Sequence, residues 1–315
     1  MVQNMNDEKI LPDLITSEIS NYYSLKSNRD KILLIGHDAL RGGAEILLAN
    51  MIKEFLKQNN EIVLIVKHGG SLLEQYKELV PTFIIDSDNK IEYYIKKLNQ
   101  IGYQSAILNT VLSANFLPIL NKYNFYSISL VHELPGLISY LNAENFVENI
   151  ADFADFVVFP SSYVCEKFEE IAPVIGKKLI QAQGLYNTYE SFDNARARQA
   201  LEERYNIPKD NNIILNVGAA EKRKGFDLFF EVSQKLKNEN YTFIWVGLIK
   251  EDIKNEYLEK ACHEDNIILT GFISDRDEFM SYYAACDLFF LSSREDPFPS
   301  VVLEAFNAKK TRYRF

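Results

Sequence analysis

The sequence predicts an α/β protein of two domains, each built on a parallel sheet with helices on both faces. Short apolar runs rich in Ile, Leu, Val and Phe alternate with helical stretches, which is typical of parallel sheets. The pattern breaks at 187–205, where apolar residues are few, and restarts with the same plan of strand, glycine-bearing loop and helix. The length of 315 residues is about twice that of a common domain. We therefore expect a linker near 187–205.

The first domain is expected at residues 29–190, after a helical lead-in over residues 1–28 that packs outside the first sheet. The apolar residues of the lead-in at helical spacing are Ile15, Ile19 and Tyr22 or Tyr23. A helix is predicted at 44–57, after the first strand. The runs predicted to be strands are 31–36, 61–66, 82–86, 106–109, 126–133 and 156–161.

The second domain is expected at residues 200–315, with a helix at 226–237. Its predicted strands are 212–218, 242–247, 266–272 and 287–293. A further helix is predicted at about 299–308, and no apolar run follows it. We therefore expect an incomplete, truncated second domain, with an open sheet edge and an apolar helix surface left uncovered.

Composition excludes several classes of protein. The chain is 47% hydrophobic and 25% charged, as in ordinary globular proteins. Its net charge of −10 argues against general nucleic-acid binding. It has no run of about 20 apolar residues and no secretory signal at its start. We expect a cytoplasmic protein, with contact at the inner face of a membrane left open. The cysteines, Cys165, Cys262 and Cys286, are too far apart in sequence to suggest a metal site or a disulfide framework.

The first loop that could bind a ligand contains Gly42 and Gly43. These residues lie between a predicted strand and helix, so the backbone there can approach an anion at the helix start. The alternative is a plain turn in which Glu45 complements the helix dipole. The pattern GxGxxG is absent, and no acid ends the second strand, which disfavours a dinucleotide site.

The second loop runs from Gly218 to Gly225 and carries Lys222, Arg223 and Lys224. Cations just before a helix N-terminus oppose the helix dipole, and a phosphate between them and the helix start would reverse that penalty. The alternative is a solvated charged loop. The chain has no metal-ligand spacing, P-loop or nucleophile elbow.

Two further loops carry acids and a histidine. Asp296 and Glu304 lie before and within the helix predicted at about 299–308, where both could face the crevice at the strand ends and accept hydrogen bonds from sugar hydroxyls. The sequence neighbours of Glu304 are apolar, so a simple exposed acid is the less favoured interpretation. His132 ends a predicted strand beside Glu133, where ligands bind, although a core histidine is as common. We interpret Asp86–Ser87–Asp88 as a polar turn rather than a metal-binding DxD motif.

Together these motifs resemble the GT-B glycosyltransferases, and among them the retaining enzymes of family 4. The clearest match is LSSREDPFPSVVLEA, which is similar to the E-x7-E element of that family. The other matching stretches are 31–48, 129–136, 156–164, 216–231, 243–247 and 268–275. The resemblance implies two Rossmann-like domains facing across a cleft. It also implies a nucleoside-diphosphate sugar held mainly by the second domain, a glycan, lipid-linked or small-molecule acceptor, and no metal or other cofactor.

The resemblance also implies roles for single residues. Lys224 would contact the diphosphate, Glu304 the ribose hydroxyls and Asp296 the sugar. His132 would contact the transferred sugar, and Gly42–Gly43 would lie beside the phosphates and the acceptor.

This sequence departs from the family pattern at several points. Ala219 stands where an arginine often follows the glycine of the diphosphate loop, here Gly218, and Arg223 could substitute for that arginine. The first acid of E-x7-E is Asp, and NAKKTRYRF replaces the strands and final helix that the family usually has after this point. Three alternatives therefore stay open: a non-catalytic remnant that at most binds a sugar nucleotide, a sugar-nucleotide epimerase that would use His132 and Glu133, and a Rossmann oxidoreductase.

Overall fold

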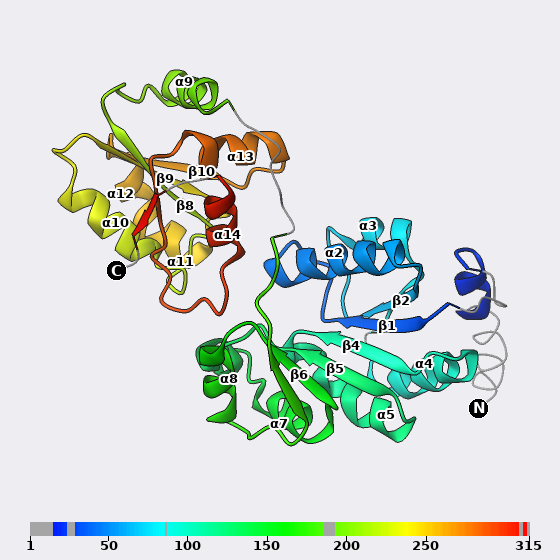
Figure 1. The fold of residues 1–315 in the computed structure, drawn as a ribbon. Helices are drawn as coiled ribbons and strands as arrows, with labels where there is room; N and C mark the ends of the chain where they lie inside the picture. Colours follow the sequence, from blue (N-terminus) through cyan, green and yellow to red (C-terminus); the bar gives the residue numbers. More distant parts are fainter. Residues whose placement is uncertain (1–14, 24–28, 86, 186–192, 309–310, 314–315) are drawn as a thin grey trace, which may run out of the picture. The chain divides into compact units, whose positions relative to one another are not determined.

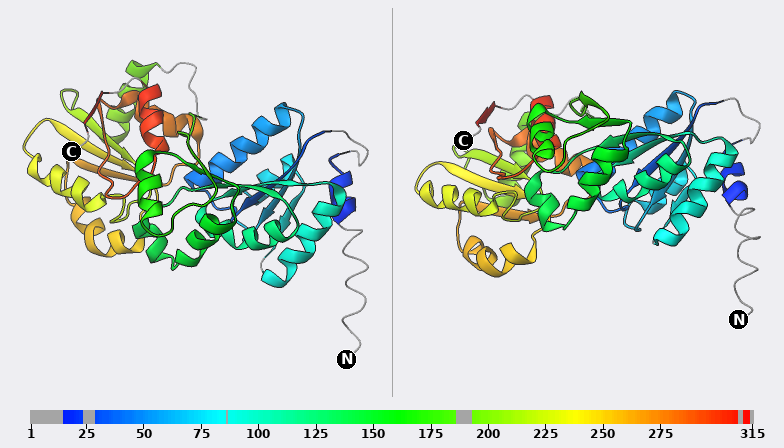
Figure 2. Two further views of the ribbon diagram at one scale, coloured as in Figure 1. Left: turned by 60° about the horizontal axis from the view of Figure 1, so that its bottom comes forward. Right: turned by 90° about the horizontal axis from the view of Figure 1, so that it is seen from below.

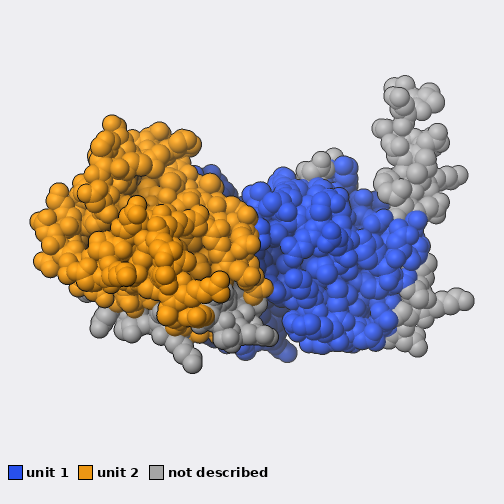
Figure 3. Space-filling view, turned by 90° about the horizontal axis from the view of Figure 1, so that it is seen from above, with its two compact units in different colours: residues 1–183 blue, residues 184–315 orange. Residues whose placement is uncertain are grey.

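The computed structural model describes residues 15–23, 29–85, 87–185, 193–308 and 311–313 (Figure 1). The chain divides into two compact units, residues 1–183 and residues 184–315, which Figure 3 colours blue and orange. Each unit has its own sheet and its own apolar cores.

In the described part of unit 1, seven parallel strands form one sheet in the order β3-β2-β1-β4-β5-β6-β7. They are β1 (Lys31–Gly36), β2 (Glu61–Val66), β3 (Thr82–Ile84), β4 (Ser105–Asn109), β5 (Tyr126–Leu130), β6 (Phe156–Phe159) and β7 (Lys177–Ile180). The strand order reverses at β1, which β2 and β4 flank. Sheets of this order bind ligands at the carboxyl ends of the strands beside the reversal.

Helices cover the sheet of unit 1 on both faces, as Figures 1 and 2 show. One face packs against α2 (Gly43–Lys57) and α3 (Leu73–Leu79). The segments on the other side are α4 (Asp88–Ile101), η1 (Val111–Phe116), α5 (Leu117–Lys122), α6 (Pro135–Tyr140), α7 (Glu144–Phe153) and α8 (Ser162–Glu169). Successive strand residues point to opposite faces, so the continuous apolar runs of the strands supply both cores.

The described part of the lead-in is helical at 15–20. Ile15, Ile19 and Tyr23 are buried in the same core as α4 and α5, which agrees with the predicted spacing. The Tyr23 hydroxyl donates to the backbone oxygen of Ile62 at 3.2 Å and ties this segment to β2. The rest of the lead-in lies outside the described residues, and so does Asp86 of the predicted polar turn.

The described residues of unit 2 contain one parallel sheet of five strands in the order β10-β9-β8-β11-β12. The strands are β8 (Asn212–Val217), β9 (Tyr241–Val246), β10 (Ile267–Gly271), β11 (Leu288–Phe290) and β12 (Thr311–Tyr313). One face packs against α10 (Phe226–Lys235), α11 (Glu251–Ile253) and α12 (Glu259–Cys262), with the π-helical η2 (Lys254–Leu258) between the last two. The other face packs against α9 (Asn194–Tyr205), α13 (Arg276–Ala285) and α14 (Ser300–Asn307).

Two expectations about unit 2 were wrong. Most of the expected linker at 187–205 is helix α9, whose Ala197 and Leu201 are buried in a core of this unit. The Asp193 side chain caps its first turn by accepting a hydrogen bond from the Arg196 amide at 3.0 Å. The second expectation was an open sheet edge after the helix predicted at about 299–308. In the structure, strand β12 follows that helix and pairs in parallel with β11.

Three details refine the sequence interpretation. Strand β7 was not predicted, since its sequence KKLI is half polar and all of its residues are exposed at the sheet edge. Strand β5 ends at Leu130, so His132 lies in the segment after the strand rather than within it. In the part of the chain that the structure describes, no helix combines the length and the apolarity needed to cross a membrane.

Candidate functional site

The glycine loop of unit 1 leads directly into helix α2. Gly42 occupies the N-cap position with an extended backbone, and no side chain among the described residues caps the helix. Glu45 lies in the first turn, where a carboxylate complements the helix dipole. Burial raises the pKa of the Glu45 carboxyl above its ordinary value. Gly42 and Gly43 thus form a helix start beyond the carboxyl end of β1, where the sequence predicts it.

His132 is connected to that helix start through Asn109, the last residue of β4. The Asn109 amide nitrogen donates to the backbone oxygen of Ala44 in α2 at 2.9 Å. Its carbonyl oxygen lies 2.9 Å from Nε2 of His132. The other ring nitrogen, Nδ1, lies 3.3 Å from the side-chain nitrogen of Gln183. His132 and the glycine loop therefore belong to one hydrogen-bonded cluster.

Glu133 is 7% exposed and accepts two backbone hydrogen bonds through Oε2. The amide of Val111, at the start of η1, donates at 3.1 Å, and the amide of His132 donates at 2.9 Å. Burial raises the pKa of Glu133 to about 7 and lowers the pKa of His132 to about 4. Near neutral pH the cluster thus combines an uncharged imidazole with a carboxyl that is partly protonated.

Strained backbone lies beside this pair. Thr110, which follows Asn109, has a φ of 81°, in a region that β-branched residues rarely adopt. It is 5% exposed, and its hydroxyl oxygen is buried without a hydrogen-bond partner. Strain of this kind concentrates at functional sites, where the surrounding structure maintains it.

Two more histidines lie at the same end of the sheet. His37 follows β1 and His68 follows β2, and their ring centroids are 5.4 Å apart. Nδ1 of His37 lies 3.1 Å from a carboxylate oxygen of Asp38. Burial alone would raise the pKa of Asp38, but hydrogen bonds from His37 and the Leu40 amide lower it below its ordinary value. Sequence reasoning included His37 and Asp38 in the glycine loop after the first strand but gave no role to them or to His68, although both histidines follow predicted strands.

In unit 2, the loop from Gly218 to Gly225 connects β8 to α10. Gly225 is the N-cap of α10 and has a φ of 72°. A Cβ atom there would lie 1.9 Å from the backbone oxygen of Ser292, so a larger residue requires a backbone shift. The backbone oxygen of Gly218 accepts a 2.9 Å hydrogen bond from the indole of Trp245. Both ends of the predicted diphosphate loop are therefore held by contacts within unit 2.

The cations of this loop have carboxylate partners in unit 2. The ammonium group of Lys224 pairs with Asp296, whose side chain is 10% exposed. Arg223 donates to Glu221 at 2.7 Å and to the backbone oxygen of Glu295 at 3.1 Å. The neighbouring pairs are Lys222 with Glu256 at 2.9 Å, and Arg294 with Asp227 through hydrogen bonds of 2.6 and 2.7 Å. These carboxylates offset the unfavourable position of the cations near a helix start.

Glu304 lies in the second turn of α14 and is 5% exposed. The hydroxyl of Tyr283, in the neighbouring helix α13, donates to its Oε2 at 2.8 Å. An acid within an apolar sequence needs a polar partner, and this hydroxyl is one. In the structure the Glu304 side chain is buried and bonded to α13.

The structure thus brings the predicted residues together in two groups, one in each unit. Unit 1 gathers Gly42, Gly43 and His132, and sequence reasoning missed Asn109, which joins them. The sequence signal that could have identified Asn109 is a polar residue at the end of an apolar strand. In unit 2, the loop of Lys224 and the loop of Asp296 are joined by ion pairs. Among the described residues, no group of three or more His, Cys, Asp and Glu side chains is placed to hold a metal ion.

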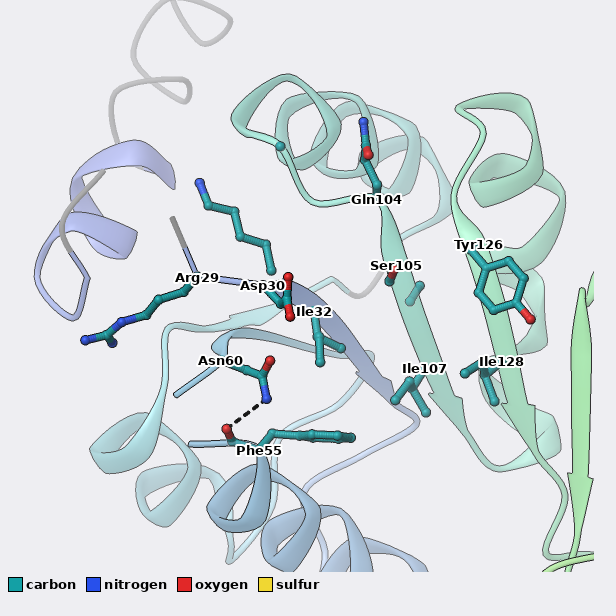
Figure 4. A pocket seen from close by; sticks show the side chains of 13 residues that line it. Arg29, Asp30, Ile32, Phe55, Asn60, Gln104, Ser105, Ile107, Tyr126 and Ile128 are labelled. Atoms are coloured by element: carbon teal, nitrogen blue, oxygen red, sulfur yellow. Dashed lines mark hydrogen bonds between the residues drawn. The ribbon is translucent and has the colours of Figure 1, made fainter. Parts of the chain in front are cut away.

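A separate cavity of about 670 Å³ lies at the opposite, amino ends of the strands of unit 1 (Figure 4). Three strands contribute Ile32, Ile107 and Ile128 to its lining. At its edge, the side chain of Asn60 donates to the backbone oxygen of Phe55 at 3.1 Å. The residues predicted for the functional site are not among the described residues that line this cavity.

Comparison with known proteins finds a family match within unit 2. Residues 197–311 match the glycosyl transferases group 1 family. The processive diacylglycerol alpha-glucosyltransferase of Acholeplasma laidlawii is 25% identical over 167 residues, which are 52% of this chain and 48% of that enzyme. The alpha-galactosylglucosyldiacylglycerol synthase of Streptococcus pneumoniae is 34% identical over 98 residues, which are 30% of this chain and 25% of that protein. The matched regions therefore span about half or less of these relatives.

Solved structures show the fold of both units. HepE of Anabaena, solved in complex with UDP and glucose, has a TM-score of 0.70 at 18% identity, over 90% of this chain and 80% of that one. A glycosyltransferase from Rickettsia africae has a TM-score of 0.70 at 18% identity, over 91% and 79%. The chain therefore has the GT-B fold of these glycosyltransferase structures, and its residues 197–311 match the glycosyl transferases group 1 family.

Proposed function

We propose that this chain is a retaining glycosyltransferase that moves a hexose from a nucleoside-diphosphate sugar to an acceptor hydroxyl. The observation that carries the proposal is the group 1 domain at 197–311, because it contains both the cationic loop with Lys224 and the acidic loop with Asp296. HepE, which has the same fold, was solved with UDP and glucose and also with UDP-glucose. UDP-glucose is therefore the first donor to test.

The proposed chemistry needs positive charge at the leaving diphosphate. When the bond from the sugar to the diphosphate breaks, negative charge develops on the phosphate oxygens. Fixed charges and backbone N–H groups aimed at that position stabilise the transition state by several kcal/mol in other enzymes. Lys224, Arg223 and the start of α10 are the groups proposed for this task, without a metal cofactor. Their loop is held in place before any ligand arrives, by Gly225 and by ion pairs.

The Lys224–Asp296 ion pair fits this role as a resting state. While no phosphate is bound, the carboxylate of Asp296 balances the positive charge of Lys224. We propose that the diphosphate takes over the ammonium group, and that Asp296 is then released to meet hydroxyl groups of the sugar. The proposed partner of the ribose hydroxyls is Glu304, which must then share or exchange its hydrogen bond from Tyr283.

In unit 1, the proposed roles are contact of His132 with the transferred sugar and of Gly42–Gly43 with the phosphates and acceptor. They rest on family resemblance and on the cluster that joins these residues. The names of the Acholeplasma and Streptococcus relatives refer to diacylglycerol lipids. A lipid hydroxyl in a vesicle is therefore the first acceptor to test, before glycans and small sugars.

The test is release of nucleoside diphosphate by the purified full chain from UDP-, GDP- and ADP-sugars, with and without diacylglycerol vesicles. We expect acceptor-dependent release that Lys224→Ala reduces. Lys235→Ala is the matched control, because that lysine is exposed in the last turn of α10 and pairs with Glu231. Conversion of the donor to another sugar nucleotide without acceptor would favour an epimerase. No conversion of any donor with any acceptor would contradict the proposal.

A further inference from the structure

The hydrogen bonds around Asn109 determine which nitrogen of His132 carries the proton. The atom of Asn109 that lies 2.9 Å from the backbone oxygen of Ala44 must be a donor, because a carbonyl oxygen only accepts. That fixes the orientation of the Asn109 amide and directs its oxygen toward His132. The amide oxygen also only accepts, so Nε2 of His132, at 2.9 Å, must carry a hydrogen.

The second ring nitrogen agrees with this assignment. In the neutral imidazole with a hydrogen on Nε2, Nδ1 has a lone pair and requires a donor. The side-chain nitrogen of Gln183 lies 3.3 Å from it and can donate. Burial of the ring disfavours the cation, since it lowers the pKa of His132 to about 4.

We propose that Asn109 is a positioning residue that holds His132 as a neutral imidazole with its proton on Nε2 and its lone pair on Nδ1. Backbone pairing between β4 and β5 fixes the position of Asn109 relative to the segment that carries His132. Asn109 is the last residue of β4 and pairs in register with Leu130 of β5. The next amide, of Thr110, donates to the backbone oxygen of Leu130 at 3.1 Å. The end of β4, which carries Asn109, is thus locked to the end of β5, two residues before His132.

This arrangement restricts what His132 can bind. A ligand that replaces Gln183 at Nδ1 must donate a hydrogen bond, so a sugar hydroxyl fits and an unprotonated phosphate oxygen does not. The same amide holds the first turn of α2 through Ala44, so Asn109 couples the histidine to the glycine loop. The effect of Asn109 on turnover rests on the proposed function, whereas the protonation pattern of the ring does not.

The test is a nitrogen–proton correlation spectrum of the full chain labelled with ¹⁵N-histidine. The chain has four histidines, and His132→Gln assigns the relevant signals. In the wild type we expect a proton bound to Nε2 of His132 and none on Nδ1. Asn109→Asp keeps an acceptor and should therefore keep the proton on Nε2, while its negative charge favours a second proton on Nδ1. Asn109→Leu removes the acceptor, so the proton should be shared between both nitrogens or exchange rapidly with water.

The matched control is Asn99→Leu. Asn99 makes the same kind of bond in unit 1, from its side-chain nitrogen to the backbone oxygen of Tyr123 at 3.0 Å, and has no part in the cluster. It should leave the spectrum of His132 unchanged. A proton on Nδ1 in the wild type would overturn the proposal, whether or not the variants fold well. An unchanged Nε2–H signal in Asn109→Leu would also overturn it.

Turnover supplies a second readout. Asn109→Leu should lower kcat about tenfold or more, the scale on which partners that orient histidines act at other sites, and Asn109→Asp should retain more activity than Asn109→Leu. Equal activity of Asn109→Leu and the Asn99→Leu control would contradict the positioning role. If the wild type transfers no sugar but shows the expected spectrum, the proposed function fails and the tautomer assignment stands.

Discussion

Substitutions in the Lys224–Asp296 pair should change nucleoside-diphosphate affinity in opposite directions. Lys224→Ala removes the proposed phosphate contact, whereas Asp296→Asn removes the carboxylate that competes with phosphate for the ammonium group. We therefore expect weaker binding of UDP by Lys224→Ala and equal or tighter binding by Asp296→Asn. UDP is the appropriate ligand, since it lacks the transferred sugar that Asp296 is proposed to meet.

The magnitude follows from how exposed the pair is. The side chain of Lys224 is 22% exposed and that of Asp296 is 10% exposed, so neither charge is fully screened by water. A charge-assisted hydrogen bond in such surroundings contributes about 1–3 kcal/mol, which corresponds to a loss of about 5- to 150-fold in affinity. Lys224→Ala also leaves Asp296 without its ammonium partner, which should lower the free energy of unfolding by about 1–3 kcal/mol.

Titration calorimetry of the wild type, the single variants and the double variant separates these effects. If Lys224 binds phosphate, the double variant Lys224→Ala/Asp296→Asn should bind UDP as weakly as Lys224→Ala. If the lysine only neutralises Asp296, the double variant should regain wild-type affinity. That recovery, or a Lys224→Ala variant as tight as the Lys235→Ala control, would refute the reasoning.

Three further predictions concern other residues. Glu304→Gln keeps an acceptor for the neighbouring tyrosine but removes the charge, so calorimetry should show weaker UDP binding while the Tm changes little; a lower Tm with unchanged affinity would indicate a structural role. The folded-state pKa of Glu133, about 7, lies above its unfolded value of about 4.3, so this group's stabilisation is present at low pH and lost as pH rises toward 7. Between pH 5 and 7, Glu133→Gln should gain stability relative to the wild type by at most about 3 kcal/mol. His132, with a folded-state pKa of about 4, has the opposite sign: stability is lost as pH falls from about 6.5 toward 4, so His132→Gln should gain on acidification. Urea unfolding across this pH range measures the stability of both variants relative to the wild type. Variant stability profiles that run parallel to the wild-type profile would contradict both predictions. Gly225→Ala should lower the free energy of unfolding by about 1–3 kcal/mol, whereas Gly43→Ala, whose added Cβ meets nothing within 4 Å, should not; equal effects in thermal unfolding would disprove the close-contact argument.

The central strands were predictable because strands buried on both faces are continuous apolar runs. All residues of β2 are buried, and only the first residue of β8 is exposed, so both stand out in the sequence. Edge strand β7 and helix α9 lack that signal. The residues of β7 are exposed, and those buried in α9 are Ala197 and Leu201, too few to give a clear helical period. Their structure depends on contacts with neighbouring elements, which outweigh weak local patterns.

The loops of the candidate site were predictable, but their contacts were not. Glycines, clustered cations and acids at strand ends mark the loops of Gly42, Lys224 and Asp296. The ion pair between the last two joins residues 72 positions apart. The bond from Asn109 to His132 likewise depends on the register of β4 and β5, which a single sequence does not give. Local chemistry therefore indicated the loops of the candidate site, while tertiary pairing decides the protonation and charge of each group.

Transfer with retention is tested most directly by following the anomeric proton signals of one reaction. UDP-glucose has the α configuration, so NMR of the full chain with UDP-glucose and diacylglycerol vesicles resolves donor and product. The account predicts that the donor signal falls only when acceptor is present, and that an α-glucoside signal rises in proportion. A β-glucoside product would contradict retention, and consumption of the donor at the same rate without acceptor would contradict transfer itself.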